Sequence, residues 1–263
     1  MKYLKVELVF LCAIIVLSLV VGYFVLRSGS NTDTNNPPKF IQADFIDLKK
    51  IYSISKFRSG SGHDFSGGGE TCRSMKHYFN TQDNQEKMSL FEQNNGIPPK
   101  PDGINDINIY SPVDGTIADV QREQMPIGEQ IYISPKSNPN YTIRLFHIYL
   151  NERIKKGSKI SAGQKIGIIS LYQNTDIAIL AGRYSRKYIS YFDVMPDNIF
   201  AKYVDRGVKS RSELIISKEA RDADPLQCNG EMFVQKNDNF DPKDFIFLSG
   251  YINPQPTILK IQK

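Results

Sequence analysis

Histidine is scarce in this sequence: its 263 residues include only His63, His77 and His147. A zinc centre that catalyses hydrolysis needs three protein ligands and one open position for water. Any metal site that uses imidazole nitrogen must therefore draw on these three residues and be completed by carboxylates.

The sequence also lacks a stripe of basic residues interleaved with aromatic residues. Residues 1–27 hold three of the 33 lysines and arginines and one of the 28 aspartates and glutamates, which leaves a net charge of +3 on the remainder. This scattered, nearly balanced charge excludes nucleic acid as a partner. It supports at most a mild attraction to an anionic cell wall.

Cysteine is equally rare, and one of the three, Cys12, lies inside a long apolar run near the N-terminus. Cys72 and Cys228 are the two that remain for the rest of the chain, where an oxidising compartment permits one disulfide between them. A structural disulfide is the favoured interpretation. The alternative, a reactive thiol at Cys72, has only His77 nearby as a base.

The apolar run itself, Leu8 to Leu26, contains 19 residues without a charge. At about 1.5 Å per residue, a helix of this length crosses the core of a bilayer. A cleaved signal peptide is the alternative, but its apolar region is about 7–15 residues long and ends in a small-x-small site. The positive-inside rule, applied to Lys2 and Lys5, places the N-terminus in the cytoplasm. We therefore expect a transmembrane signal anchor over residues 1–27 in the cell membrane, followed by an extracytoplasmic domain.

Composition divides the remaining chain. Residues 28–39 are polar and contain proline, which is typical of a linker. Short β-branched and aromatic runs separated by Gly, Pro and Asn then predict a mainly β domain over residues 40–204. This domain has a surface insertion near 81–108, with a short helix around Glu86 to Gln93, and residues 205–263 form an extension packed on it. Later in the chain, helices are expected only in "MPDNIFAKYVDRG" and "SRSELIIS".

Two segments of the β domain are more specific than strand propensity requires: "YSPVDGTIADV" and "RIKKGSKISAGQKIGIIS". Their paired glycine turns allow a β-ribbon to fold back tightly, because glycine accepts positive φ. Together with "YTIRLFHIYL", they resemble the lysostaphin-type zinc metallopeptidases, which cut peptide cross-bridges of peptidoglycan. The resemblance covers about Ile109 to Ser170. It implies an antiparallel β-sheet core of the duplicated hybrid motif type with short helices.

The family's zinc ligands transfer poorly to this chain. In the family, a His-x-Gly-x-Asp motif supplies two ligands, and a His-x-His strand supplies a catalytic group and the third ligand. Alignment on "GSGHD" matches Asp64 to the ligand aspartate and puts Gly60 where the first histidine belongs. On the later strand, Asp176 takes the place of the catalytic histidine and Ala178 that of the ligand. Two of three ligands are therefore missing.

The catalytic histidine of the family's "YxHL" strand does have a counterpart, since His147 in "LFHIYL" matches it. The resemblance thus implies His147 and Asp176 as candidate catalytic residues. A rebuilt metal site would use Asp64 and His63, which only an irregular glycine-rich turn could bring to one ion. Asp176, His77 or Glu70 would complete the coordination sphere.

Each candidate also has a structural interpretation. His63 and Asp64 would brace the glycine-rich loop through backbone hydrogen bonds. His147 would be a hydrogen-bonded residue within a strand. His77 would be a surface or packing residue. Asp176 would form an ion pair with one of three arginines, Arg58, Arg73 or Arg144.

The function implied is non-catalytic: binding of peptidoglycan or a cell-wall-associated protein, with no cofactor. The alternative is an active endopeptidase in which Asp64 and His63 hold zinc and His147 acts on the metal-bound water. A third possibility is a structural ectodomain without a ligand.

Overall fold

A computed structural model describes residue 18 and residues 32–81, 100–101, 103, 106–123, 128–182, 187–234 and 241–251. The predicted transmembrane helix, apart from Ser18, and the predicted helix around Glu86 to Gln93 lie outside these residues. In the part of the chain that is described, no helix has both the length and the hydrophobicity needed to cross a membrane.

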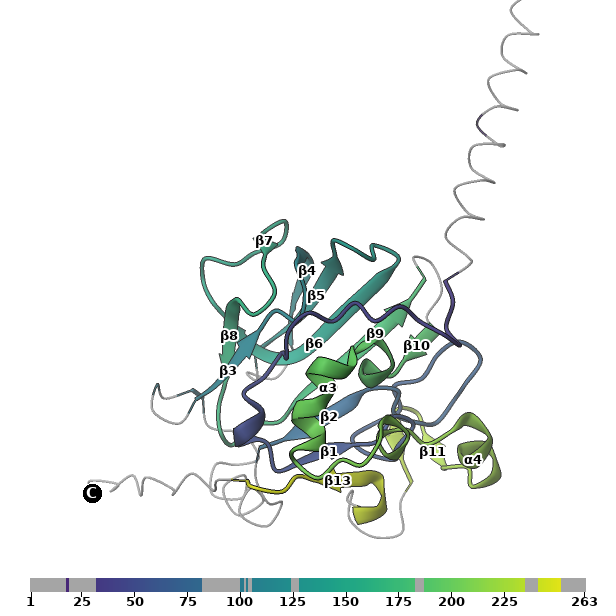
Figure 1. The fold of residues 1–263 in the computed structure, drawn as a ribbon. Coiled ribbons are helices and arrows are strands. Elements are labelled where there is room, and N and C mark those ends of the chain that lie inside the picture. The colour runs from purple at the N-terminus through teal and green to yellow at the C-terminus, as the bar shows by residue number, and fades with distance from the viewer. Residues whose placement is uncertain are drawn as a thin grey trace, which may run out of the picture.

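The fold is mainly β and is built on one large antiparallel sheet (Figure 1). Its strands follow the order β13-β1-β2-β9-β6-β5-β4-β7, with β10 beside β9 and with β3 joined to β6 through β8. The predicted fold class, an antiparallel β-sheet with short helices, is confirmed at this level. The strands are β1 (Ser53–Ser55), β2 (His77–Asn80), β3 (Ile107–Tyr110), β4 (Gly115–Arg122), β5 (Glu129–Pro135), β6 (Tyr141–Leu150), β7 (Lys159–Ile160), β8 (Lys165–Ile169), β9 (Thr175–Ala181), β10 (Lys187–Ile189) and β13 (Phe245–Phe247).

The two faces of the sheet carry different hydrophobic clusters. Successive side chains of a strand point to opposite faces, and β9 shows the result: Ile177 and Ile179 belong to the main core, whereas Ala178 does not. Ala178 packs instead in a smaller cluster with Phe57, Met75, Phe146 and Tyr188. We call the side of this smaller cluster the site face, because the candidate residues gather there.

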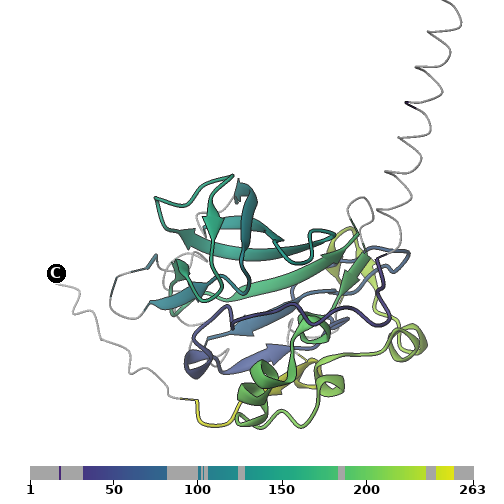
Figure 2. The same cartoon turned by 45° about the horizontal axis from the view of Figure 1, so that its top comes forward.

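The opposite face is covered by the 3-10 turn η2 (Tyr191–Val194) and helix α3 (Asp197–Val204), as both views of the fold show (Figures 1 and 2). The rings of Phe192 and Tyr203 lie 5.1 Å apart in the main core. Tyr203 also donates a hydrogen bond to Asp44, 2.7 Å away, and so ties the start of the domain to α3. Helix α3 confirms the prediction made from "MPDNIFAKYVDRG".

The second predicted helix was wrong in extent. "SRSELIIS" forms only the 3-10 turn η3 (Arg211–Leu214), because its chain turns extended at Ile215. The helix of this region, α4 (Lys218–Ala223), follows it and was not predicted. Its N-cap is Ser217, whose hydroxyl accepts a hydrogen bond from the amide of Ala220 at 3.1 Å.

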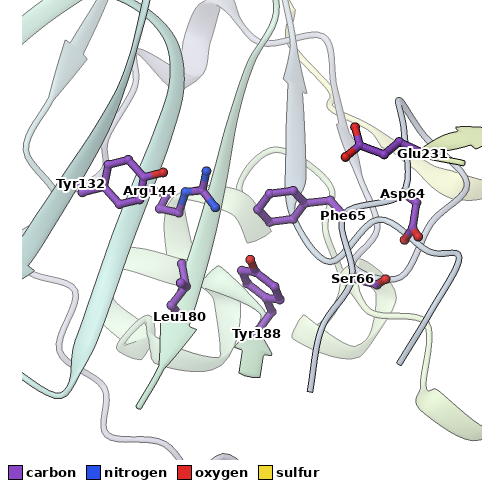
Figure 3. Close-up of a pocket in the computed structure, with 8 residues that line it drawn as sticks. All are labelled: Asp64, Phe65, Ser66, Tyr132, Arg144, Leu180, Tyr188 and Glu231. Carbon is purple, nitrogen blue, oxygen red and sulfur yellow. The ribbon is translucent and has the colours of Figure 1, made fainter. Parts of the chain in front are cut away.

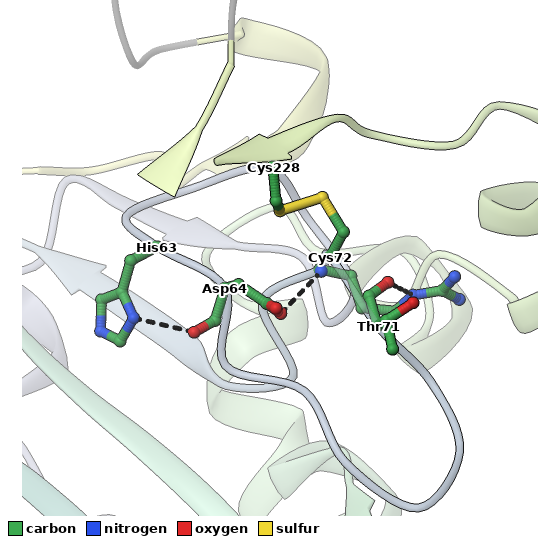
Figure 4. Close-up of a disulfide and its surroundings, with 6 residues drawn as sticks. His63, Asp64, Thr71, Cys72 and Cys228 are labelled. Atoms are coloured by element: carbon green, nitrogen blue, oxygen red, sulfur yellow. Dashed lines mark hydrogen bonds between the residues drawn. A yellow bond between two sulfur atoms is a disulfide. The ribbon is translucent and has the colours of Figure 1, made fainter. Parts of the chain in front are cut away.

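The C-terminal segment joins the same structure. β13 pairs with β1 at one edge of the sheet, and a small hairpin of β11 (Cys228–Asn229) and β12 (Met232–Phe233) precedes η4 (Pro242–Asp244). Cys72 and Cys228 form a disulfide, which confirms the predicted pairing (Figure 4). It fastens the glycine-rich loop of residues 57–76 to the hairpin.

Candidate functional site

A bulge in β6 places His147 on the site face. Tyr141, Ile143 and Leu145 alternate into the main core, but Ile148 also lies there, so the alternation slips by one residue. The pairing with β5 records the slip: Ile131 lies opposite Leu145, and Glu129 lies opposite Ile148. His147 absorbs it with a φ of +60°, a left-handed conformation that is rare for residues other than glycine.

His147 and Asp176, the two predicted catalytic residues, lie in contact. Nε2 of His147 is 3.3 Å from Oδ1 of Asp176, and Nδ1 is 2.5 Å from Oε2 of Glu123. Asp176 is fully buried, and its other oxygen, Oδ2, lies 2.5 Å from Nζ of Lys76. The four side chains form a chain of alternating charge, Lys76–Asp176–His147–Glu123, in which His147 is half-buried.

Each charge in this chain is stabilised by its neighbours. Burial by itself lowers the pKa of His147, but Asp176 and Glu123 outweigh it and raise that pKa to about 9. Burial likewise opposes the charge on Asp176 and on Lys76, yet Lys76 and His147 hold the pKa of Asp176 well below its usual range. Asp176 in turn raises the pKa of Lys76. At neutral pH His147 is therefore an imidazolium whose two N–H groups both face carboxylates.

Lys76 occupies the centre of the site. Its side chain is 2% exposed, and its ammonium lies 4.5 Å from the centre of the Phe146 ring, 4.7 Å from that of Tyr78 and 4.9 Å from that of Phe65. Aromatic faces attract a cation most strongly where water is excluded. The site thus has a built-in cation, surrounded by three rings and one carboxylate.

His63 also meets this ammonium. Nε2 of His63 is 3.4 Å from Nζ of Lys76, and Nδ1 is 2.9 Å from the backbone oxygen of Asp64. An ammonium can only donate hydrogen bonds, so Nε2 of His63 accepts from Lys76 and Nδ1 donates to the backbone oxygen of Asp64. An imidazole with one accepting and one donating nitrogen is neutral. Burial first, and then Lys76, lower the pKa of His63 in agreement with this.

The side chain of Asp64 does not take part in this group of charged residues around Lys76. Its Oδ1 accepts a hydrogen bond from the backbone amide of Arg73 at 3.1 Å, so the carboxylate points away from the ring of His63 (Figure 4). The loop does turn irregularly at these residues, as its glycines permit. The turn, however, separates the side chains of His63 and Asp64 instead of bringing them to one point.

The residues present do not fit a zinc ion. Among the described residues, no three His, Cys, Asp or Glu side chains are grouped in a way that could hold a metal. The two remaining candidates are already engaged: His77 is buried between the carbonyl of Ser55 and the hydroxyl of Ser190, and Glu70 pairs with Arg58 and Arg73. Ala178, which the sequence resemblance aligned with a ligand, is buried in the apolar cluster.

Two members of the cluster were missed from the sequence, Lys76 and Glu123. The partner expected for Asp176 was an arginine, whereas the structure supplies Lys76 and His147. No local signal marks Lys76, which directly precedes β2. It reaches Asp176 because β2 pairs with β9, with Tyr78 opposite Asp176.

A pocket of about 510 Å³ opens beside the cluster on the site face (Figure 3). The rings of Phe65, Tyr132 and Tyr188 line it, together with the guanidinium of Arg144. Two carboxylates, Asp64 and Glu231, line its other side. The pocket therefore combines an aromatic surface with charges of both signs, which is the composition of a site for a small polar ligand.

Comparison of the sequence with protein-family models gives no match, and comparison with curated proteins gives none either. Among solved structures, the chain is similar to one of the SpoIIQ–SpoIIIAH pore-forming complex, with 10% identity over 65% of this chain and 99% of that one and a TM-score of 0.38. It is also similar to the catalytic domain of the antimicrobial peptidase lysostaphin from Staphylococcus simulans, with 13% identity over 51% and 84% of the two chains and a TM-score of 0.32.

A third similar structure is Csd3 of Helicobacter pylori, with 14% identity over 80% of this chain and 45% of that one and a TM-score of 0.38. At these identities and TM-scores, the similarities decide neither activity nor partners. Those rest on the residues of the site.

Proposed function

We propose that this chain is a membrane-anchored, extracytoplasmic protein with a lysostaphin-like domain that binds peptidoglycan or a wall-associated protein without hydrolysing it. The observation that carries the proposal is the ammonium of Lys76, which lies 2.5 Å from Asp176 and 3.4 Å from His63. The ammonium of Lys76 therefore occupies the contacts of Asp176 and His63 that a metal ion would need. A zinc ion brought to the same groups would meet a buried positive charge.

His147 supports the same conclusion. A general base must have a free nitrogen within reach of the proton that it removes. Both nitrogens of His147 face carboxylates, at 2.5 Å and 3.3 Å, and the raised pKa keeps both protonated at neutral pH. The group of four charged side chains is thus suited to hold β6 and β9 together with the loop that ends at Lys76. The pocket beside this group offers the surface for a ligand.

The test uses the full-length protein purified in detergent. We expect it to sediment with purified cell walls, to contain no stoichiometric zinc by elemental analysis, and to release no new amino groups from the walls. Stoichiometric zinc that disappears in His63→Ala or Asp64→Asn, together with wall hydrolysis, would instead establish the endopeptidase. Failure to sediment with walls in any buffer of physiological ionic strength would refute the binding function.

A further inference from the structure

The pocket on the site face is lined by three charged side chains, Arg144, Asp64 and Glu231. Arg144 forms no ion pair with any carboxylate of the described residues, and neither does Asp64 or Glu231. Arg144 and Asp64 are half-buried, whereas Glu231 is exposed. A half-buried charge gives up part of its hydration, and an ion pair offsets that cost. A ligand with both an anionic and a cationic group would supply such pairs on the two sides of this pocket.

Arg144 is prepared for an anion. Its guanidinium lies 4.7 Å from the ring centre of Tyr132 and 5.1 Å from that of Phe65, and one nitrogen, Nη2, donates to Gln130 at 2.8 Å. These contacts fix the plane of the group. Its Nε is buried and has no hydrogen-bond partner among the described residues, so a ligand in the pocket would meet the terminal nitrogens of the group. A planar, oriented guanidinium matches a carboxylate.

The opposite side of the pocket is prepared for a cation. The amide of Asp64 donates to the backbone oxygen of Glu231 at 2.7 Å, so the glycine-rich loop and the β11–β12 hairpin are joined there. Both side chains line the pocket on the side away from Arg144, with the ring of Phe65 between (Figure 3). The disulfide between Cys72 and Cys228 connects the same two segments and holds this wall in place.

We propose that the pocket binds a short zwitterionic peptide, such as an uncross-linked peptide of the cell wall. Its carboxylate pairs with Arg144 and its ammonium with Glu231 and Asp64. The peptide body lies against Phe65, Tyr132 and Tyr188. This inference rests on the proposed wall-binding function and names the chemical group that the site recognises.

The experiment measures binding of Nα-acetyl-L-lysyl-D-alanyl-D-alanine to the full-length protein in detergent by calorimetry. Two modified peptides test the ligand side: a C-terminal amide removes the carboxylate, and Nε-acetylation removes the ammonium. We expect each to bind about 10-fold to 100-fold more weakly, as the loss of a hydrogen bond to a charged group predicts. These two comparisons leave the protein unchanged and therefore do not depend on the folding of a variant.

Variants test the protein side. Arg144→Gln should weaken binding of the parent peptide and remove its advantage over the amide, and Arg144→Lys should recover part of that advantage. Glu231→Gln should reduce the advantage over the Nε-acetyl peptide. Arg153→Gln, which removes an exposed arginine outside the pocket, is the matched control and should bind like the wild type.

The outcomes separate the two proposals. If the wild type sediments with walls but binds the parent peptide and its amide equally, the pocket assignment is wrong and the wall-binding function stands. If it binds the peptide as expected but never sediments with walls, the pocket assignment stands and the wall-binding function is wrong. A protein that does neither refutes both.

Discussion

Replacing Lys76 by methionine tests the central feature of the site, a buried ammonium in contact with a buried carboxylate. Lys76 and Asp176 are 2% and 0% exposed, and their charged atoms are 2.5 Å apart. Removing one partner of such a pair leaves the other charge buried and costs about 3–5 kcal/mol. His147 still faces Asp176 at 3.3 Å, and methionine keeps the apolar contact with Phe146. We therefore expect the low end, a loss of about 3 kcal/mol.

The assay is urea unfolding of the full-length protein at pH 7, followed by the fluorescence of its 14 tyrosines, since it has no tryptophan. Lys155→Met is the matched control: this lysine is exposed, and its replacement should change the free energy of unfolding by less than about 0.5 kcal/mol. Lys76→Met combined with Asp176→Leu removes both charges and should be more stable than Lys76→Met alone. A loss below about 1 kcal/mol in Lys76→Met would show that the ammonium is not buried against Asp176, and the argument against zinc would fall with it.

Three further predictions concern the surroundings of the site. Because the pKa of His147 is raised from 6.5 to about 9, its charge contributes stability that is complete below about pH 6.5 and is lost as the pH rises through 9. The loss is about 3 kcal/mol in urea unfolding, and His147→Gln should remove this pH dependence. Replacing both Cys72 and Cys228 by serine opens a connection spanning 156 positions and should cost about 4–5 kcal/mol, with the reduced wild type as the comparison. Gly62 and Gly157 both have a positive φ, +74° and +87°, so alanine is strained at either position. Gly62→Ala should lower the melting temperature more, because its added Cβ would lie 1.9 Å from the hydroxyl oxygen of Tyr78, whereas nothing lies within 4 Å of a Cβ added at Gly157.

Local patterns were sufficient for much of the fold. The alternation and β-branched residues of "YTIRLFHIYL" predicted β6, and the capped apolar pattern around Ile199 and Tyr203 predicted α3. In both elements, the conformation is determined by residues within a few positions of one another in the chain. The pairing of Cys72 with Cys228 also followed from the sequence, because only one pairing was open to two cysteines.

The candidate site shows where such reasoning stops. His147 and Asp176 were identified from a resemblance of strands, and they lie together because β6 and β9 pair. The sequence could not show that a bulge turns His147 to the same face as Phe146, since this depends on the register with β5. Nor could the sequence show that the side chains of Asp64 and His63 point apart. This follows from the hydrogen bond that the amide of Arg73 donates to the carboxylate of Asp64.

Sequence by itself determined the mainly β architecture, the scarcity of metal ligands and the identity of the two cysteines that are joined. The tertiary structure alone decided that Lys76 supplies the cation of the site and that Arg144 lines a pocket without an ion pair among the described residues. Lysine and arginine are ordinarily surface residues, so nothing in the local pattern marks one as buried or one as lacking a counter-charge. Those properties arise from segments far apart in the chain, which meet only when β2, β6 and β9 form one sheet and the disulfide-bound loop closes over it.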